Sequence, residues 1–209
     1  MKLVKLSALL LVAIAFTQCG KDAAPVSAPA MLPVDAPLIV RVNDAEKFTA
    51  FSDSVSLPYV QAIDVAILNK YSNGPWTGAL VASGADKFDW IWTFKDTLGQ
   101  GGSMTENETI YSIDSLYGFK VGSTWTISKK SALLQDLLNQ RANGFSLAKD
   151  AQFSSLWNSA SKADVMNLFI QHKEIAAVGN QFFQQDWSWM THVAAWSEID
   201  LALRKNKLI

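Results

Sequence analysis

The chain opens with a short apolar segment that ends near its only cysteine, Cys19. Lys2 and Lys5 precede this segment, which covers residues 6–16. A run of about 11 residues is too short to cross a bilayer, which takes roughly 20, so it predicts a signal peptide over residues 1–18. With Cys19 at the cleavage point, the folded part has no other thiol. It must therefore be held by packing, without a disulfide, a thiolate metal site or a cysteine nucleophile.

The position of Cys19 resembles the cleavage site of a bacterial lipoprotein signal. There the cysteine thiol takes a diacylglyceryl group and the new amino terminus is acylated, so palmitate-type chains would anchor the protein to a membrane. Phe16 and Gln18 depart from the strict motif, and the alternative is an ordinary secretory leader with a free Cys19. Gly20 is not the aspartate that retains lipoproteins at the inner membrane. This favours the outer membrane, at its periplasmic face or at the cell surface.

Length and charge exclude some classes of partner. Removing the leader leaves 191 of the 209 residues, enough for one compact domain with a sizeable core. The formal net charge goes from −1 to −3, because the leader holds two lysines and no acid. Such a chain has no electrostatic footprint for nucleic acid, so we expect none as a partner. Eight Trp and eleven Phe can fill the core.

A proline-rich segment separates the leader from the first strand. Pro25, Pro29, Pro33 and Pro37 recur every four residues among Ala, Val and Ser. This spacing favours extended, semi-rigid backbone, so residues 19–37 are predicted to be the lipidated cysteine and a Pro/Ala-rich tether. A single domain over residues 38–209 should follow.

The pattern within that domain predicts an α+β fold, with an antiparallel β-meander sheet flanked by helices. Asn43 and Glu46 suit a capping box for a helix that ends near Ser56. Asp150 suits the cap of another helix through Trp157. The other expected helices cover residues 60–71, 130–141 and 173–183. The expected strands cover residues 38–42, 78–83, 89–95, 109–114, two runs within 117–128, 165–170 and 195–203.

The last residues read as the beginning of a hairpin. A strand over residues 199–203 is followed by a turn at residues 204–206 and the first step of a return strand at 207–209. A hairpin cut short leaves an unpaired edge. We therefore expect the natural product to be longer, with this chain as its N-terminal portion.

No motif with a known chemical mechanism is present. The chain has no P-loop, dinucleotide fingerprint, His-Glu-x-x-His pair or Gly-x-Ser-x-Gly elbow. His172 and His192 lack ligand-spaced neighbours, and turn or cap contacts are expected of both. The acid pairs at residues 86/89 and 106/108 are expected at the surface, since spacing alone does not create a glycosidase cleft. The sequence therefore predicts no catalytic residue, metal site or cofactor.

Two Asp-Trp-x-Trp clusters are the remaining candidates for binding. Trp90 and Trp92 share one face of a predicted strand, and Trp187 and Trp189 follow the last predicted helix. Exposed tryptophan rings can stack on sugar rings, so either pair could form a glycan-binding surface. The alternative is that these rings pack in the core.

Several segments together resemble a family of uncharacterised bacterial cell-envelope lipoproteins. The resemblance covers most of residues 32–209 and is carried by residues 32–43, 124–128, 163–170 and 196–200. It implies an α+β N-terminal module followed by further domains, with no known reaction and no functional residues to transfer.

These observations predict a non-enzymatic lipoprotein that serves binding or assembly. Its expected partners are the membrane, through lipid at Cys19, and envelope proteins or glycans. The first alternative is glycan recognition through Trp187/Trp189 or Trp90/Trp92. The second is a hydrolase whose catalytic group assembles only in space, with His172 or His192 beside a serine and a carboxylate.

Overall fold

The computed structural model describes residues 26–54, 65–84, 87–95, 110–113, 115–175, 178, 187–192, 194–204 and 207–208. Its helices are η1 (Ala28–Met31), α2 (Ala45–Ser54), α4 (Val65–Tyr71), α5 (Ser131–Ala142), η2 (Leu147–Lys149), α6 (Ala151–Ser159) and η3 (Ser188–His192). Its strands are β1 (Leu38–Val42), β2 (Trp76–Gly84), β3 (Lys87–Lys95), β4 (Tyr111–Ile113), β5 (Leu116–Val121), β6 (Thr124–Ser128), β7 (Met166–Gln171), β8 (Trp196–Leu201), β9 (Leu203–Arg204) and β10 (Lys207–Leu208).

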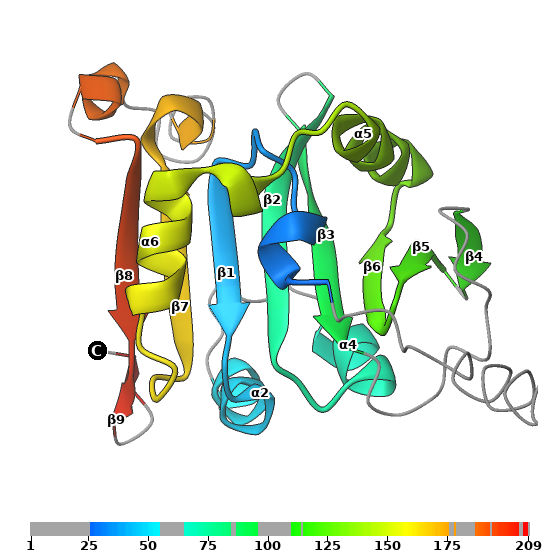
Figure 1. Ribbon diagram of the computed structural model, residues 1–209. Coiled ribbons are helices and arrows are strands. Elements are labelled where there is room, and N and C mark those ends of the chain that lie inside the picture. The colour runs from blue at the N-terminus through cyan, green and yellow to red at the C-terminus, as the bar shows by residue number, and fades with distance from the viewer. Residues whose placement is uncertain are drawn as a thin grey trace, which may run out of the picture.

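Eight of these strands form one open antiparallel sheet, in the order β4-β5-β6-β3-β2-β1-β7-β8 (Figure 1). The α+β class is therefore confirmed. The simple meander is wrong, because β3 pairs with β6 rather than β4, and β1 is inserted between β2 and β7. The β-branched residues Ile39, Val40 and Val42 of β1 suit this central position, since the strand is buried on both faces.

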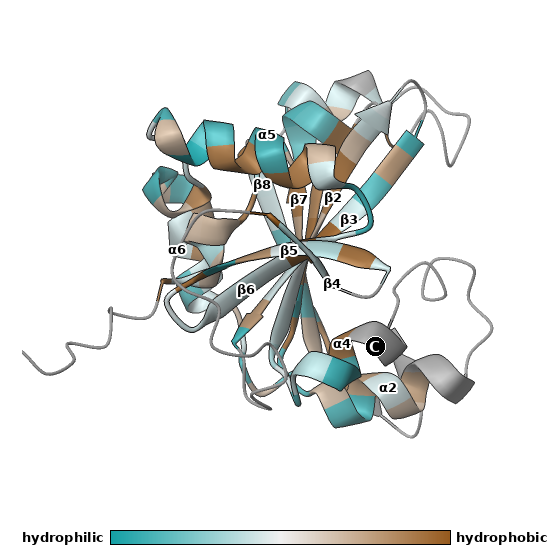
Figure 2. Ribbon diagram, turned by 90° about the vertical axis from the view of Figure 1, so that its right-hand side faces the viewer, coloured by the Kyte–Doolittle hydropathy of each residue, from teal (hydrophilic) through white to brown (hydrophobic). Residues whose placement is uncertain are grey.

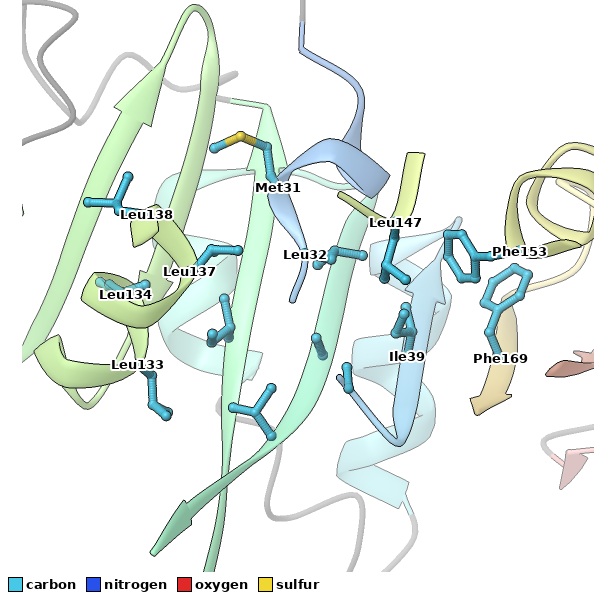
Figure 3. Packing of buried hydrophobic residues seen from close by; sticks show 14 of the residues in the cluster. Met31, Leu32, Ile39, Leu133, Leu134, Leu137, Leu138, Leu147, Phe153 and Phe169 are labelled. Atoms are coloured by element: carbon cyan, nitrogen blue, oxygen red, sulfur yellow. The ribbon is translucent and has the colours of Figure 1, made fainter. Parts of the chain in front are cut away.

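Helices cover both faces of the sheet (Figure 2). On one face, the leucine seam of α5 and Phe153 of α6 pack on β1, β2, β3 and β7 (Figure 3). On the other face, Phe48 of α2 and Leu68 of α4 pack against Trp76, Trp92 and their neighbours. Each strand alternates its side chains between these two clusters, so both faces of the central strands are apolar.

The segment before β1 belongs to the domain. Met31, Leu32 and Ala36 are fully buried in the first cluster. The Gln140 side chain accepts from the backbone N–H of Val34 at 3.1 Å, which ties the segment to α5. The prediction that the tether extends to Pro37 is therefore wrong for residues 26–37. Prolines prevent regular helix and sheet, but the apolar residues between them can still pack.

Two predicted helix caps have different outcomes. Asp150 Oδ1 accepts from the backbone N–H of Phe153 at 2.9 Å, which confirms Asp150 as the cap of α6. The prediction for Asn43 is wrong, because Asp44 Oδ1 accepts from the backbone N–H of Lys47 instead. The Asn43 side chain points across the sheet and bonds to residues near α6 and to β7.

The final strands match the predicted hairpin. β9 and β10 pair antiparallel as a separate two-stranded sheet, with Lys207 opposite Arg204. The leader, Cys19, the start of the helix expected at residues 60–71 and most of the helix expected at 173–183 lie outside the described residues.

Candidate functional site

The first tryptophan pair lies within the sheet. Trp90 and Trp92 stack with their ring centroids 5.1 Å apart, and both contact the cluster covered by α2 and α4. Trp92 is only 6% exposed, because Gly78 opposite leaves room for its ring. A Cβ built on Gly78 would lie 2.5 Å from that ring. Trp92 is thus part of the core, and the half-buried Trp90 is the accessible member of the pair.

The second tryptophan pair lies beside the outermost strand. η3 carries Trp189, which is 60% exposed, and Trp187 just before it is half-buried. In Figure 1, η3 sits beside the end of β8 at which that strand begins. Of the two tryptophans expected here, Trp189 presents the larger surface to solvent.

His172 forms a serine–histidine pair at the same end of β8. It is 3% exposed, and its Nε2 lies 2.8 Å from Ser197 Oγ. Its Nδ1 lies 3.1 Å from the carbonyl oxygen of Met190, which can only accept, so Nδ1 carries the proton and Nε2 accepts from Ser197. This is the tautomer of a general base, but a backbone carbonyl occupies the place of the carboxylate in a triad. His192 is exposed.

A buried arginine joins β1, β7 and α6. Arg41 is 5% exposed; its Nε donates to Asn167 Oδ1 at 2.8 Å, and its terminal nitrogens donate to the carbonyls of Trp157 and Ala160 at 2.8 and 3.0 Å. Its guanidinium also lies 4.7 Å from the centre of the Trp157 ring. Burial lowers the pKa of Arg41, while the charges of two acids on β8 oppose this shift.

Those acids, Glu198 and Asp200, complete the network on β8. The register places Arg41, Asn167 and Asp200 in one row across three strands. Asn167 donates from Nδ2 to Asp200 Oδ1 in a short hydrogen bond, and the backbone N–H of Ser161 donates to the same oxygen at 3.2 Å. We refer to Arg41, Asn167, Glu198 and Asp200 as the β8 network.

Glu198 is the member of the β8 network with a raised pKa. Burial, followed by the hydrogen bond and the charge of Asp200, raises the pKa of Glu198 to about 7 from its ordinary 4.5, against the opposing influence of Asn167 and Arg41. Its Oε1 is buried and has no hydrogen-bond partner among the described residues. About half of the Glu198 carboxyl groups are therefore protonated at neutral pH.

The β8 network produces no local pattern in the sequence. Its hydrogen bonds join Arg41 to Asn167, 126 residues apart, and Asn167 to Asp200, 33 residues apart, and only the strand register brings these residues together. One signal was available. Arg41 is the only charged residue in the apolar run Leu38–Val42, and a charge at such a position needs buried partners.

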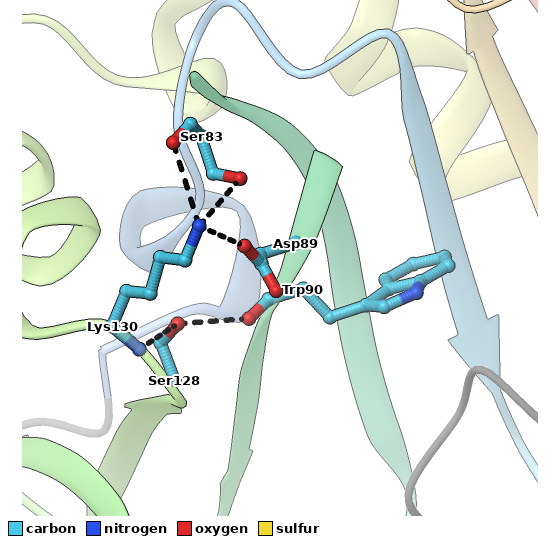
Figure 4. A network of polar contacts seen from close by, with 5 residues as sticks. All are labelled: Ser83, Asp89, Trp90, Ser128 and Lys130. Atoms are coloured by element: carbon cyan, nitrogen blue, oxygen red, sulfur yellow. Dashed lines mark hydrogen bonds and ion pairs between the residues drawn. The ribbon is translucent and has the colours of Figure 1, made fainter. Parts of the chain in front are cut away.

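A second polar network pins the β2–β3 hairpin to the start of α5 (Figure 4). Lys130 Nζ lies 2.7 Å from Asp89 Oδ2 and 3.0 Å from Ser83 Oγ. Burial acts to raise the pKa of Asp89, but hydrogen bonds from Lys130 and Ser83 and nearby lysine charges hold it below its ordinary value. Strand alternation sends Asp89 and Trp90 to opposite faces, so this network cannot share a ligand with the tryptophan pair.

Comparisons with known proteins give no match: no family model, no curated protein and no solved structure is similar to this chain at a significant level. Within the described residues, no three His, Cys, Asp or Glu side chains gather in a group that could hold a metal ion. None of the described helices is long and apolar enough to cross a membrane.

Proposed function

We propose that this protein is a membrane-anchored cell-envelope lipoprotein whose domain acts as a non-enzymatic binding or assembly module. The apolar leader, the single Cys19 behind it and Gly20 support an acylated anchor, with the outer membrane favoured over the inner. The partners would be envelope proteins or glycans held at a distance from the bilayer set by the anchored segment.

One observation supports binding at the β8 side of the domain. Two large apolar side chains there are exposed: Trp189, at 60%, and Ile199 of β8, at 44%. Exposed tryptophan is enriched at binding surfaces, where it contributes a large area at low entropic cost. We call the surface formed by η3 and β8 the β8 surface.

Metabolic labelling with an alkyne-tagged fatty acid tests the anchor. The full chain should incorporate the label and fractionate with membranes, and Cys19→Ala should do neither. A processed Cys19→Ala protein that stayed tightly on the membrane would contradict lipid anchoring.

Photo-cross-linking in the native host tests the β8 surface. A cross-linking amino acid at position 199 or 189 should capture the same specific partner. Position 145 is a matched control, because Phe145 is also 60% exposed and follows α5, away from β8. Equal capture from all three positions would argue against a binding surface at β8.

Glycan recognition is a second candidate function, supported by the exposure of Trp189. A sugar ring stacked on its indole would be lost in Trp189→Ala and kept in Trp189→Phe to the extent that any aromatic ring suffices. Titration of the protein with envelope oligosaccharides, followed by Trp fluorescence, would measure this. No shift that depends on Trp189 would reject it, and the same test applies to Trp187 and Trp90.

A hydrolase is a third candidate, supported by the 2.8 Å contact between His172 and Ser197. In a serine hydrolase this oxygen would react with a fluorophosphonate probe, with fluoride as the leaving group. Labelling of the wild type that disappears in Ser197→Ala would establish an active nucleophile. Absence of labelling would leave the pair as a structural contact between η3 and β8.

A further inference from the structure

The docked segment before β1 shortens the chain that would join the domain to a lipid at Cys19. Fully extended, residues 19–37 would span about 65 Å, at about 3.6 Å per residue. The structure places this segment in the domain from Val26 onward, however, so only six residues separate Cys19 from the folded part. The link from Cys19 to Val26 therefore spans at most about 25 Å.

Contacts along the segment fix its path over the sheet. Thr124 Oγ1 donates to the carbonyl oxygen of Val26 at 3.2 Å, and Arg141 Nη1 donates to that of Ala30 at 2.6 Å. Met31 and Leu32 are almost fully shielded from solvent. Release of the segment would expose both apolar side chains to water, so the segment stays docked and the link stays short.

Val26 meets the domain at one corner of the sheet. Thr124 is the first residue of β6, and the turn at residues 122–123 joins it to β5. Lys95, the last residue of β3, lies opposite Thr124. We call this end of β3, β5 and β6, with the turn between the last two, the β6 corner.

The link is shorter than the domain is wide. A folded domain of this size has a radius of gyration of about 16 Å, which corresponds to a diameter of about 40 Å. If the surface farthest from Val26 rested on a bilayer, Val26 would stand about 40 Å above the lipid, beyond the reach of about 25 Å. Orientations with the β6 corner toward the lipid need the least extension of the link, and they therefore cost the least chain entropy.

We propose that the β6 corner is the surface that faces the bilayer, with the lipid headgroup layer as its partner. This inference rests on the proposed anchor at Cys19 and adds the orientation that a short link gives to the domain. The β8 surface lies five strand spacings away from β6, about 24 Å across the sheet, and η3 precedes β8 at the opposite end of the strands. The surface proposed to bind envelope partners would therefore stay accessible while the β6 corner lies against the lipid.

Two serines at the ends of β6 test this orientation. Ser123→Cys lies in the turn before β6, and Ser131→Cys, the matched control, lies at the start of α5 just beyond the other end of β6. Because an acylated Cys19 has no free thiol, the introduced cysteine is the only site for a thiol-reactive donor dye. The lipidated chain is added to preformed phosphatidylethanolamine/phosphatidylglycerol vesicles that carry an acceptor dye on their headgroups.

Energy transfer should place position 123 nearer to the headgroups than position 131. The five residues of β6 span about 17 Å, so we expect a difference of about 10 Å or more, with position 123 within about 30 Å of the lipid. Equal distances, or a shorter distance for position 131, would overturn the proposal.

A longer link separates the effect of its length from any affinity of the surface for lipid. Insertion of a Gly/Ser segment of about 20 residues after Lys21 adds up to about 70 Å of reach and changes none of the described residues. The difference between positions 123 and 131 should then fall at least threefold. A difference that stays unchanged would show that the short link does not orient the domain.

The wild-type chain distinguishes failure of the orientation from failure of the anchor. If Cys19 takes up the thiol-reactive dye and the chain does not bind vesicles, the anchor is wrong and the orientation fails with it. If the chain carries the acyl label and binds vesicles but the two positions are equally distant, the anchor stands and the proposed orientation is wrong.

Discussion

Arg41 and Lys130 are two cations on the same face of one sheet, and they differ in how deeply they are buried and in which groups they bind. Arg41 is buried, donates to two carbonyls around the end of α6, and balances two acids on an outer strand. Lys130 is 41% exposed in its side chain and pairs with Asp89, which is 27% exposed. Water can replace the partners of Lys130, but it cannot reach Asn167, the fully buried side chain that accepts from Arg41 Nε.

This difference indicates which polar contacts contribute most to the stability of the fold. A buried cation is expensive to isolate, so its partners become obligatory once it is enclosed. An exposed pair contributes little, because solvent screens it and each partner is well hydrated alone. The β8 network should therefore contribute strongly to the stability of α6 and β8 on the sheet. The Lys130 contacts should stabilise the β2–β3 hairpin only slightly.

Replacing Arg41 should give the largest effect. Arg41→Ala leaves two carbonyls and Asn167 without their buried donor, and the acid pair without the positive charge that offsets it. It should lower the free energy of unfolding by about 3–5 kcal/mol. Urea unfolding followed by Trp fluorescence would measure the loss. Arg41→Lys is the matched control, since it keeps the charge but not the fork of donors, and should recover only part of it. A loss below about 1 kcal/mol in Arg41→Ala would show that the buried contacts of Arg41 matter no more to stability than the exposed contacts of Lys130.

The acid pair should make stability depend on pH. The folded-state pKa of Glu198 is about 7 against an ordinary 4.5, so the folded domain binds this proton more tightly than the unfolded chain does. The resulting stabilisation is complete below about pH 4.5 and is lost as the pH rises through 7. With partial exposure discounted, this amounts to about 2 kcal/mol.

Glu198→Gln should remove that dependence, because its side chain stays neutral. Urea midpoints of the two proteins between pH 5 and 8 would converge at the acid end and separate at the alkaline end, with the variant more stable. Parallel curves over the whole range would show that Glu198 does not bind a proton near neutral pH.

Lys130 should give the smallest effect. Lys130→Met removes the contact to Asp89 and keeps the aliphatic stem, so the free energy of unfolding should fall by about 0–1 kcal/mol. High salt should reduce even this difference. Thermal unfolding at low and high ionic strength would measure it. A loss as large as that of Arg41→Ala would mean that burial does not separate the two networks.

Local patterns in the sequence were enough to predict most elements but not their assembly. Periodicity predicted the α5 leucine seam, and Asp150 marked the start of α6, because both signals act within a few residues. The position of β1 between β2 and β7 depends on pairings far apart in the chain. The proline spacing did not predict the burial of Met31 and Leu32, because it constrains the backbone but not the packing of the apolar residues between the prolines.

In the candidate site too, the local features were predictable from the sequence and the long-range contacts were not. Alternation along residues 89–95 correctly put Trp90, Trp92 and Phe94 on one face, and all three contact the same cluster. Which face water reaches was not predictable, since it depends on the helices that cover the sheet and on Gly78 opposite Trp92. The β8 network and the pairing of His172 with Ser197 follow from register, which a single sequence does not reveal.

Amide hydrogen exchange in the wild type and in Arg41→Ala tests the central claim most directly, that the buried β8 network holds α6 and β8 on the sheet. The account predicts that the variant exchanges its amides faster along α6 and β8 and at nearly unchanged rates along the β2–β3 hairpin. Equal acceleration in both regions, or none in α6 and β8, would contradict it.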